Sequence, residues 1–222
     1  MAVESKPLFH PEVIRQQVRS FTLPARVQDV QPKLQHWADL IASGRADEFK
    51  ETELLPDFLT DIFCNLLGYT RPAGPADTFT MSRERHVEVD GKFADAVLGR
   101  FQKDKAQFTV ALEGKGTRDP LDRPFAGRRM SAVDQAYRYA INLPCDWILV
   151  TSMRETRLYH KGSNQHAYER FAFLLPADTL KRACDHPIFS AARSYLWSLC
   201  PASGRLFTRL RQNQFTGRTA SL

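Results

Sequence analysis

Hydrophobic residues recur at helical spacing in two stretches of the first third of the chain. The first stretch covers residues 27–41 and is followed by Gly44, a residue type that often terminates helices. The second stretch covers residues 49–67, and Pro56 lies within its first turns. We therefore expect two amphipathic helices. The second should begin near Leu55 or be kinked there, because proline removes a helical hydrogen bond.

The middle of the chain has the pattern of three β-strands. Residues 81–89 and 92–100 flank Asp90-Gly91, a dipeptide typical of two-residue hairpin turns. A short polar turn then leads into a third strand over residues 107–115. These segments predict an antiparallel three-stranded meander.

Helix and strand patterns alternate farther downstream. The polar loop of residues 116–130 is followed by a Ser-Ala-Val-Asp sequence typical of a capped helix start, and we expect that helix over residues 131–142. The apolar run of residues 147–151 fits a buried central strand, and residues 156–160 fit another short strand. Residues 178–199 return to a helical pattern.

This order of elements predicts an α/β fold in which a mixed central sheet is flanked by helices. We divide the chain into a helical N-terminal segment (residues 1–45), a core (residues 46–175) and a C-terminal segment with a helix and a basic tail (residues 176–222). The chain has 222 residues, of which 43% are hydrophobic, so it can bury one substantial core.

Composition also bears on the cellular setting. The sequence has no run of about 18 apolar residues and its N-terminus lacks a signal-peptide pattern, so we expect a cytoplasmic protein without a membrane span. The four cysteines are scattered and form no C-x-x-C pair, which indicates reduced thiols rather than disulfides or zinc ligands. They are Cys64, Cys145, Cys184 and Cys200.

The formal net charge is +6, which favours a polyanionic partner and nucleic acid above all. Four arginines lie within twelve residues of the loop after the third strand, and a second basic cluster lies near the C-terminus. We interpret the loop arginines as candidate DNA contacts, although a merely solvated loop would look similar. These four are Arg118, Arg123, Arg128 and Arg129.

Three charged residues are expected to meet at the end of the meander. The turn between the second and third strands sets a register in which Asp95 faces Glu113 or lies one position from it. Glu113 and Lys115 are two positions apart, so they share one face of the sheet. Their neighbours are apolar, and a buried unpaired charge costs several kcal/mol. Two carboxylates suit Mg²⁺, whereas the alternative is an ordinary ion pair on a solvated face.

Two further features surround this cluster. Gln135 and Tyr139 are four positions apart on the expected helix and therefore project together. Glu51 is in register with the apolar stripe of its helix and is expected to point toward the core side, while Glu53 is expected in solvent. Glu51 could support the charged cluster, or it could be an acidic residue favoured by the helix dipole.

The spacing of the whole set resembles the PD-(D/E)xK nuclease superfamily, in the branch that carries a Q-x-x-x-Y helix. The segments FADAVLGRF, LEGKGTRDPLDRP, SAVDQAYRYA and WILVTSMRETRLY are similar to the N-terminal nuclease domain of type IIG restriction–modification enzymes and, more distantly, to the nuclease domain of type I restriction subunits. The resemblance covers roughly residues 45–175. Its residues are Glu51, Asp95, Glu113, Lys115, Gln135 and Tyr139.

The resemblance implies a restriction-endonuclease-like core and a Mg²⁺-dependent endodeoxyribonuclease. Asp95 and Glu113 would be metal ligands and Lys115 the catalytic lysine. Gln135 and Tyr139 would position the scissile strand, and Glu51 would support the site. Ala94 stands where the family name has proline.

A larger departure lies downstream of the nuclease-like region. Type IIG enzymes continue into a helical connector, an adenine methyltransferase and a DNA-recognition domain, whereas this sequence ends at Leu222 without an N-P-P-Y methyltransferase motif. We therefore expect modification and recognition to lie in a separate subunit or a missing downstream region, and dimerisation on DNA if both strands are cut. The alternatives are a silent DNA-binding or subunit-docking module and a repair or recombination nuclease of the same superfamily.

Overall fold

The computed structural model of the protein describes residues 6–20, 27–86 and 93–172. The elements, in chain order, are α1 (Pro11–Ser20), α2 (Val27–Ala42), a short 3₁₀ helix η1 (Arg45–Glu48), α3 (Glu51–Phe58), a π-helical segment η2 (Leu59–Leu66), β1 (Phe79–His86), β2 (Phe93–Gln102), β3 (Lys105–Gly114), α4 (Ala132–Asn142), β4 (Trp147–Thr151), β5 (Glu155–His160) and β6 (Glu169–Ala172).

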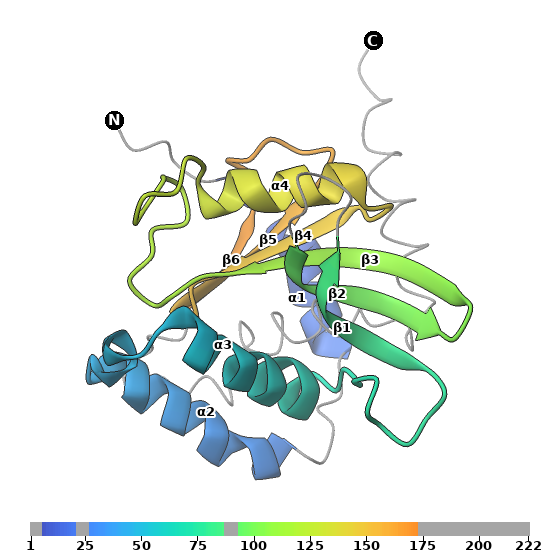
Figure 1. Ribbon diagram of the computed structural model, residues 1–222, viewed down its shortest axis with the longest axis horizontal. Coiled ribbons are helices and arrows are strands. Elements are labelled where there is room, and N and C mark those ends of the chain that lie inside the picture. Colours follow the sequence, from blue (N-terminus) through green and yellow to red (C-terminus); the bar gives the residue numbers. More distant parts are fainter. Residues whose placement is uncertain (1–5, 21–26, 87–92, 173–222) are drawn as a thin grey trace.

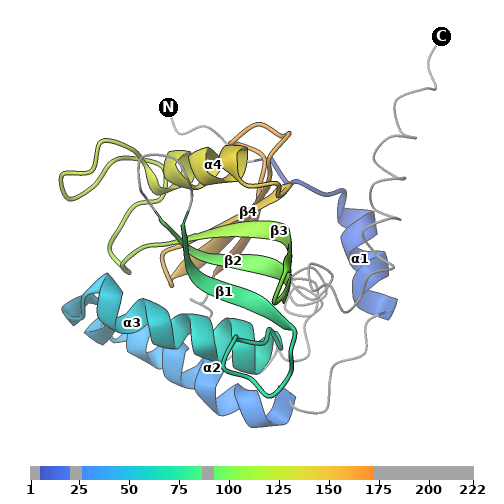
Figure 2. The same cartoon turned by 45° about the vertical axis from the view of Figure 1, so that its right-hand side comes forward.

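The six strands form one sheet in the order β1-β2-β3-β4-β5-β6. Only β3 and β4 are parallel among these neighbours, and the other pairs are antiparallel. Helix α4, which connects the two parallel strands, covers one face of the sheet, while α2 and α3 lie on the other face (Figures 1 and 2). The predicted mixed sheet flanked by helices is therefore confirmed.

Each face of the sheet has its own hydrophobic core. Along β3, Leu112 packs into the core shared with α2 and α3, whereas its neighbour Ala111 packs into the core shared with α4. This alternation is a consequence of the two-residue repeat of a strand. Trp37 of α2 is 3% exposed and belongs to the first core, so the N-terminal helical segment is part of the same packed body. Burying one such large side chain stabilises the fold by roughly 1.5–3 kcal/mol.

The helix expected over residues 49–67 is confirmed as α3 and η2. It begins at Glu51, so a regular start near Leu55 is wrong. Pro56 lies inside α3 and has no N–H to donate to the carbonyl of Thr52. The helical hydrogen-bond pattern changes one turn later. There the Leu59 N–H donates to both Leu55 O and Pro56 O, and the chain continues as the π-helical η2. Proline thus changes the helical form here instead of setting its start.

The sequence allowed two registers between β2 and β3 that differ by one position, and both occur in different parts of this strand pair. Ala96 pairs with Leu112, but beyond a bulge at Leu98 and Gly99 the pairing shifts by one position, so that Gly99 faces Phe108. A Cβ at Gly99 would lie 2.0 Å from the Gln107 carbonyl oxygen, so glycine permits the close approach at this bulge.

Several expectations concern residues outside the described parts of the chain. These are the Asp90-Gly91 turn, the helix over residues 178–199, and the cysteines Cys184 and Cys200. Cys64 and Cys145 are free thiols, as expected. The loop of residues 116–130 carries no helix or strand, and α4 begins where its capping sequence predicted, with the Asp134 N–H donating to Ser131 Oγ at 3.0 Å.

The strand β6 was not anticipated from the sequence, and it pairs with β5 at the edge of the sheet.

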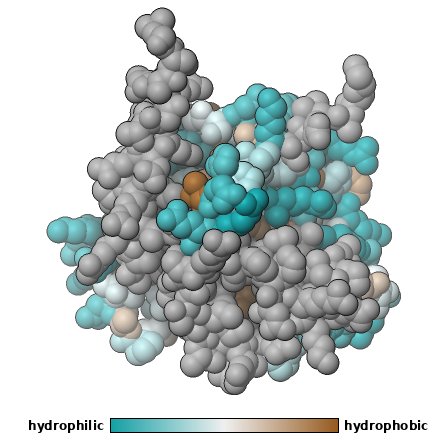
Figure 3. Space-filling view, turned by 180° about the vertical axis from the view of Figure 1, so that it is seen from behind, coloured by the Kyte–Doolittle hydropathy of each residue, from teal (hydrophilic) through white to brown (hydrophobic). Residues whose placement is uncertain are grey.

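Among the helices that the structure describes, none has the length and apolar character needed to cross a membrane. On the face opposite to that of Figure 1, the described residues in view are mainly hydrophilic, and hydrophobic ones appear only as small separate spots (Figure 3).

Candidate functional site

Glu113 and Lys115 form a buried ion pair at the end of β3. Their residues are 1% and 5% exposed, and the Lys115 ammonium contacts Glu113 Oε1. The two side chains lie on one face, as their spacing predicted. The other carboxylate oxygen, Glu113 Oε2, is buried and has no hydrogen-bond partner among the described residues. An unpaired buried carboxylate oxygen is costly, so this atom marks a position that suits a cationic ligand.

Asp95 reaches the same place from the neighbouring strand β2. Its Oδ2 accepts a hydrogen bond of 2.7 Å from the backbone N–H of Gly114, the residue between Glu113 and Lys115. Burial, followed by the charge of Asp95, raises the pKa of Glu113 to about 8 against the opposing effect of Lys115. The structure therefore brings the two predicted carboxylates close enough for their charges to interact.

Helix α4 adds Gln135 and Tyr139 above the carboxylates. Gln135 Nε2 donates to Tyr139 Oη at 2.6 Å, so the predicted i, i+4 pair is formed. Burial raises the pKa of Tyr139 to about 12, and the charge of Glu113 acts in the same direction. The tyrosine therefore stays protonated near neutral pH and presents a neutral hydroxyl next to the carboxylates.

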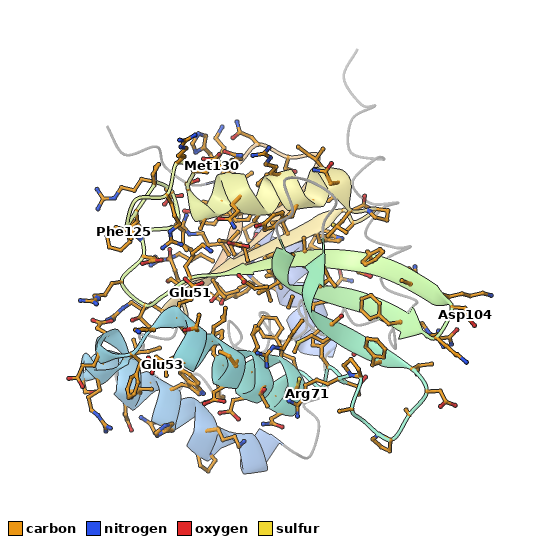
Figure 4. All side chains as sticks on the ribbon, viewed as in Figure 1. Glu51, Glu53, Arg71, Asp104, Phe125 and Met130 are labelled. Carbon is orange, nitrogen blue, oxygen red and sulfur yellow. The ribbon has the colours of Figure 1, made fainter. Side chains whose placement is uncertain are left out.

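Glu51 enters the site from the opposite layer, at the first turn of α3 (Figure 4). Its Oε2 accepts a hydrogen bond of 3.1 Å from the backbone N–H of Gly116, just beyond Lys115. Burial raises the pKa of Glu51, an effect opposed by Lys115 and reinforced by Asp95. Glu53 is exposed and caps the helix, its carboxylate accepting from the Lys50 N–H at 2.7 Å. The sequence thus placed both acids on the correct sides.

Gly114 explains how α3 can approach the strand so closely. A Cβ at this position would lie 2.5 Å from both Cδ atoms of Leu55, so the leucine packs directly on the glycine backbone. A hollow of about 130 Å³ remains between Glu51 and Asp95 beside this contact. The glycine between the glutamate and the lysine therefore brings the third acidic side chain within electrostatic range.

The four arginines of the loop do not form one uniform surface. Arg118, Arg123 and Arg129 are exposed. Arg128 is half-buried, forms an ion pair with Asp119, and lies 3.9 Å from Glu51 Oε2. The Arg128 guanidinium therefore interacts with carboxylates of the protein itself, whereas the other three arginines are exposed to solvent.

A polar cluster that sequence reasoning missed anchors the loop behind the site. Arg154 donates to both carboxylate oxygens of Asp47 at 2.8 Å each and to the Thr117 carbonyl at 2.9 Å. The Thr117 hydroxyl donates to Asp47 Oδ1 at 2.6 Å. Arg154 lies in the turn between β4 and β5. Asp47 and Arg154 are 107 positions apart, and no local pattern connects residues at such a distance.

The carboxylates of the site can be compared with the ligands that Mg²⁺ prefers. In the part of the chain that the structure describes, no three or more His, Cys, Asp or Glu side chains are grouped as a metal site. Asp95 and Glu113 nevertheless offer two carboxylates, and Glu113 Oε2 accepts no hydrogen bond within the described part of the chain. Mg²⁺ is commonly held by one or two carboxylates and keeps several waters, so this pair fits such an ion.

Comparisons with protein-family models, curated proteins and solved structures found no match to this chain.

Proposed function

We propose that this protein is a Mg²⁺-dependent endodeoxyribonuclease of the restriction type, which hydrolyses DNA phosphodiester bonds. One observation carries the proposal: the buried Glu113 carboxylate is paired with Lys115 through one oxygen and lies beside Asp95, while its second oxygen has no hydrogen-bond partner among the residues that the structure describes. Burying these charges together is expensive, and a purely structural role is better served by apolar residues of similar volume.

Each side chain of the site has its own part in the proposed reaction. Asp95 and Glu113 would hold Mg²⁺, which supplies Lewis-acid activation of the phosphate and a bound water of lowered pKa. Lys115 would hold the Glu113 carboxylate in place and offset negative charge that develops on the phosphate. On the opposite layer, Glu51 fixes the backbone of Gly116 through its hydrogen bond and so steadies the segment that carries Lys115.

Helix α4 would guide the DNA strand. The Tyr139 hydroxyl and the Gln135 amide can donate hydrogen bonds to a phosphate or sugar of the strand being cut. Arg118, Arg123 and Arg129 are exposed on the adjoining loop and can contact backbone phosphates, which position DNA without reading its sequence. Sequence recognition and methylation would come from a partner domain or subunit. Cutting both strands would need a second copy on the DNA.

The test is incubation of supercoiled plasmid with the purified protein in Mg²⁺ and in EDTA. We expect nicking in Mg²⁺ only, and its loss in Lys115→Ala. The matched control is Lys103→Ala, which changes an exposed lysine in the β2–β3 turn and should leave nicking intact.

Equal nicking by wild type and Lys115→Ala would refute the site. A protein that binds DNA in a gel shift but never nicks it, even with its partner supplied, would support the alternative of a silent DNA-binding module.

A further inference from the structure

A second, larger hollow of about 520 Å³ lies on the outer side of Glu51. Its walls come from the segment just before α3 and from the loop of residues 116–130. Glu51 also lines the smaller hollow beside Asp95, so the two hollows adjoin at this residue. The volume is in the range of about 300–1,000 Å³ that is usual for small-molecule sites.

Two exposed phenylalanines line this hollow. Three large hydrophobic side chains are exposed among the described residues: Phe49 at 44%, Phe125 at 42% and Ile141 at 69%. Phe49 and Phe125 both belong to the hollow, and Ile141 does not. An exposed aromatic ring in a concave site offers an apolar face for stacking, which a surface loop does not need for its own stability.

The backbone that carries Phe125 is held in place. The Arg128 backbone N–H and its Nε both donate to the Phe125 carbonyl at 3.1 Å, while the end of the Arg128 guanidinium pairs with Asp119. Ala126 and Gly127 have φ of 51° and 78°, which closes a tight turn between them. Phe125 lies on this turn, on the same side of the molecule as Glu51 (Figure 4). The ring is therefore presented on an ordered support, which reduces the entropy lost on binding.

Charged groups of both signs surround the aromatic rings. Lys50 and Arg118 are exposed at the wall of the hollow and can neutralise a phosphate. Glu48 and Asp119 also line it and can accept hydrogen bonds from the amino and imino groups of a nucleobase. The hollow therefore combines three kinds of group that can recognise a nucleotide. An aromatic ring can stack on the face of the base, carboxylates can accept hydrogen bonds from its edge, and cationic groups can bind the phosphate.

We propose that this hollow binds one unpaired nucleotide of a DNA strand, with its base stacked on Phe125 and its phosphate near Lys50 and Arg118. The inference rests on the proposed function in that DNA is the ligand and that the hollow adjoins the nuclease site. The nucleotide would come from a single-stranded end or from a base turned out of the duplex. The protein would then prefer DNA with an unpaired position near the cut.

The test measures binding without cleavage, by fluorescence anisotropy in EDTA. The probes are a labelled oligodeoxythymidine and an abasic oligodeoxynucleotide of the same length, which carries the same phosphates without bases. We expect wild type to bind the thymidine oligonucleotide roughly tenfold more tightly, since stacking of one base on an aromatic ring has about that effect. Phe125→Leu should abolish the preference and Phe125→Tyr should retain it. Ile141→Ala, which removes an exposed hydrophobic side chain elsewhere, should behave as wild type.

Equal binding of both probes by wild type would overturn the proposal. An unchanged preference in Phe125→Leu would overturn it as well. The plasmid assay separates this result from failure of the proposed function. Mg²⁺-dependent nicking with no base preference refutes the nucleotide site alone. Base preference without nicking, even with the partner supplied, refutes the nuclease alone.

Discussion

Lys115 contacts one oxygen of the Glu113 carboxylate, and the other oxygen of that carboxylate is buried without a hydrogen-bond partner among the described residues. The pair is thus half satisfied. Burial raises the pKa of Glu113 to about 8 in spite of the lysine beside it. A buried charge that is only half satisfied is more costly than apolar packing, so the pair is better explained by a ligand than by stability.

The ion pair itself can be tested through stability at pH 9, where Glu113 is ionised. Lys115→Met should lower the free energy of unfolding by about 3–5 kcal/mol, because it leaves a buried carboxylate without a partner. The double change Glu113→Gln with Lys115→Met should recover most of that loss. Urea unfolding in EDTA measures both, and Lys103→Met should stay within about 0.5 kcal/mol of wild type. Additive single changes would show that the pair is not coupled.

Two tyrosines of α4 provide a matched comparison. Tyr139→Phe leaves Gln135 Nε2 without its acceptor and should cost about 1 kcal/mol of stability. Tyr137→Phe removes a buried hydroxyl that has no hydrogen-bond partner among the described residues, so it should be neutral or stabilising. Under the proposed function, plasmid nicking should fall about tenfold in the first variant only. Equal nicking by both variants would remove Tyr139 from the site.

The close contact between α3 and β3 predicts coupling between Gly114 and Leu55. Gly114→Ala should destabilise the protein by about 1–3 kcal/mol, because the added methyl group overlaps the leucine side chain. The change should cost less when Leu55 is already alanine, a coupling that a double-mutant cycle by urea unfolding measures. Gly116→Ala is the control, since a Cβ there meets nothing closer than 3.8 Å. A loss in the control as large as that in Gly114→Ala would refute the steric explanation.

The polar cluster around Asp47 predicts a pH dependence. The hydrogen bond from Thr117, together with Arg154, outweighs burial and lowers the pKa of Asp47. A depressed folded-state pKa contributes stability above the unfolded value of about 3.9, and this stability is lost as pH falls through the folded-state value. Between pH 6 and pH 3, wild type should therefore lose more of its free energy of unfolding than Asp47→Asn does. Glu48→Gln, an exposed change in the same turn, should follow wild type, and parallel profiles for wild type and Asp47→Asn would contradict the assignment.

Local patterns in the sequence determined most of the elements that carry the site. The polar turn before residues 107–115 and the capping sequence at Ser131 placed β3 and α4. The spacing between Glu113 and Lys115, and between Gln135 and Tyr139, also determined which side chains share a face. These relationships depend only on the residue repeat of a strand or a helix, so they can be predicted from the sequence without knowledge of the tertiary structure.

Only the tertiary structure decided the contacts between layers. Glu51 meets Gly116 because Gly114 lets α3 pack against the strand end. Asp47 meets Arg154 because η1 lies next to the loop of residues 116–130 and the turn between β4 and β5. The hollow between the segment before α3 and the loop of residues 116–130 arises in the same way. Such contacts join residues that are far apart in the chain. They depend on how the side chains of the helices pack against the sheet, and no local sequence pattern determines that packing.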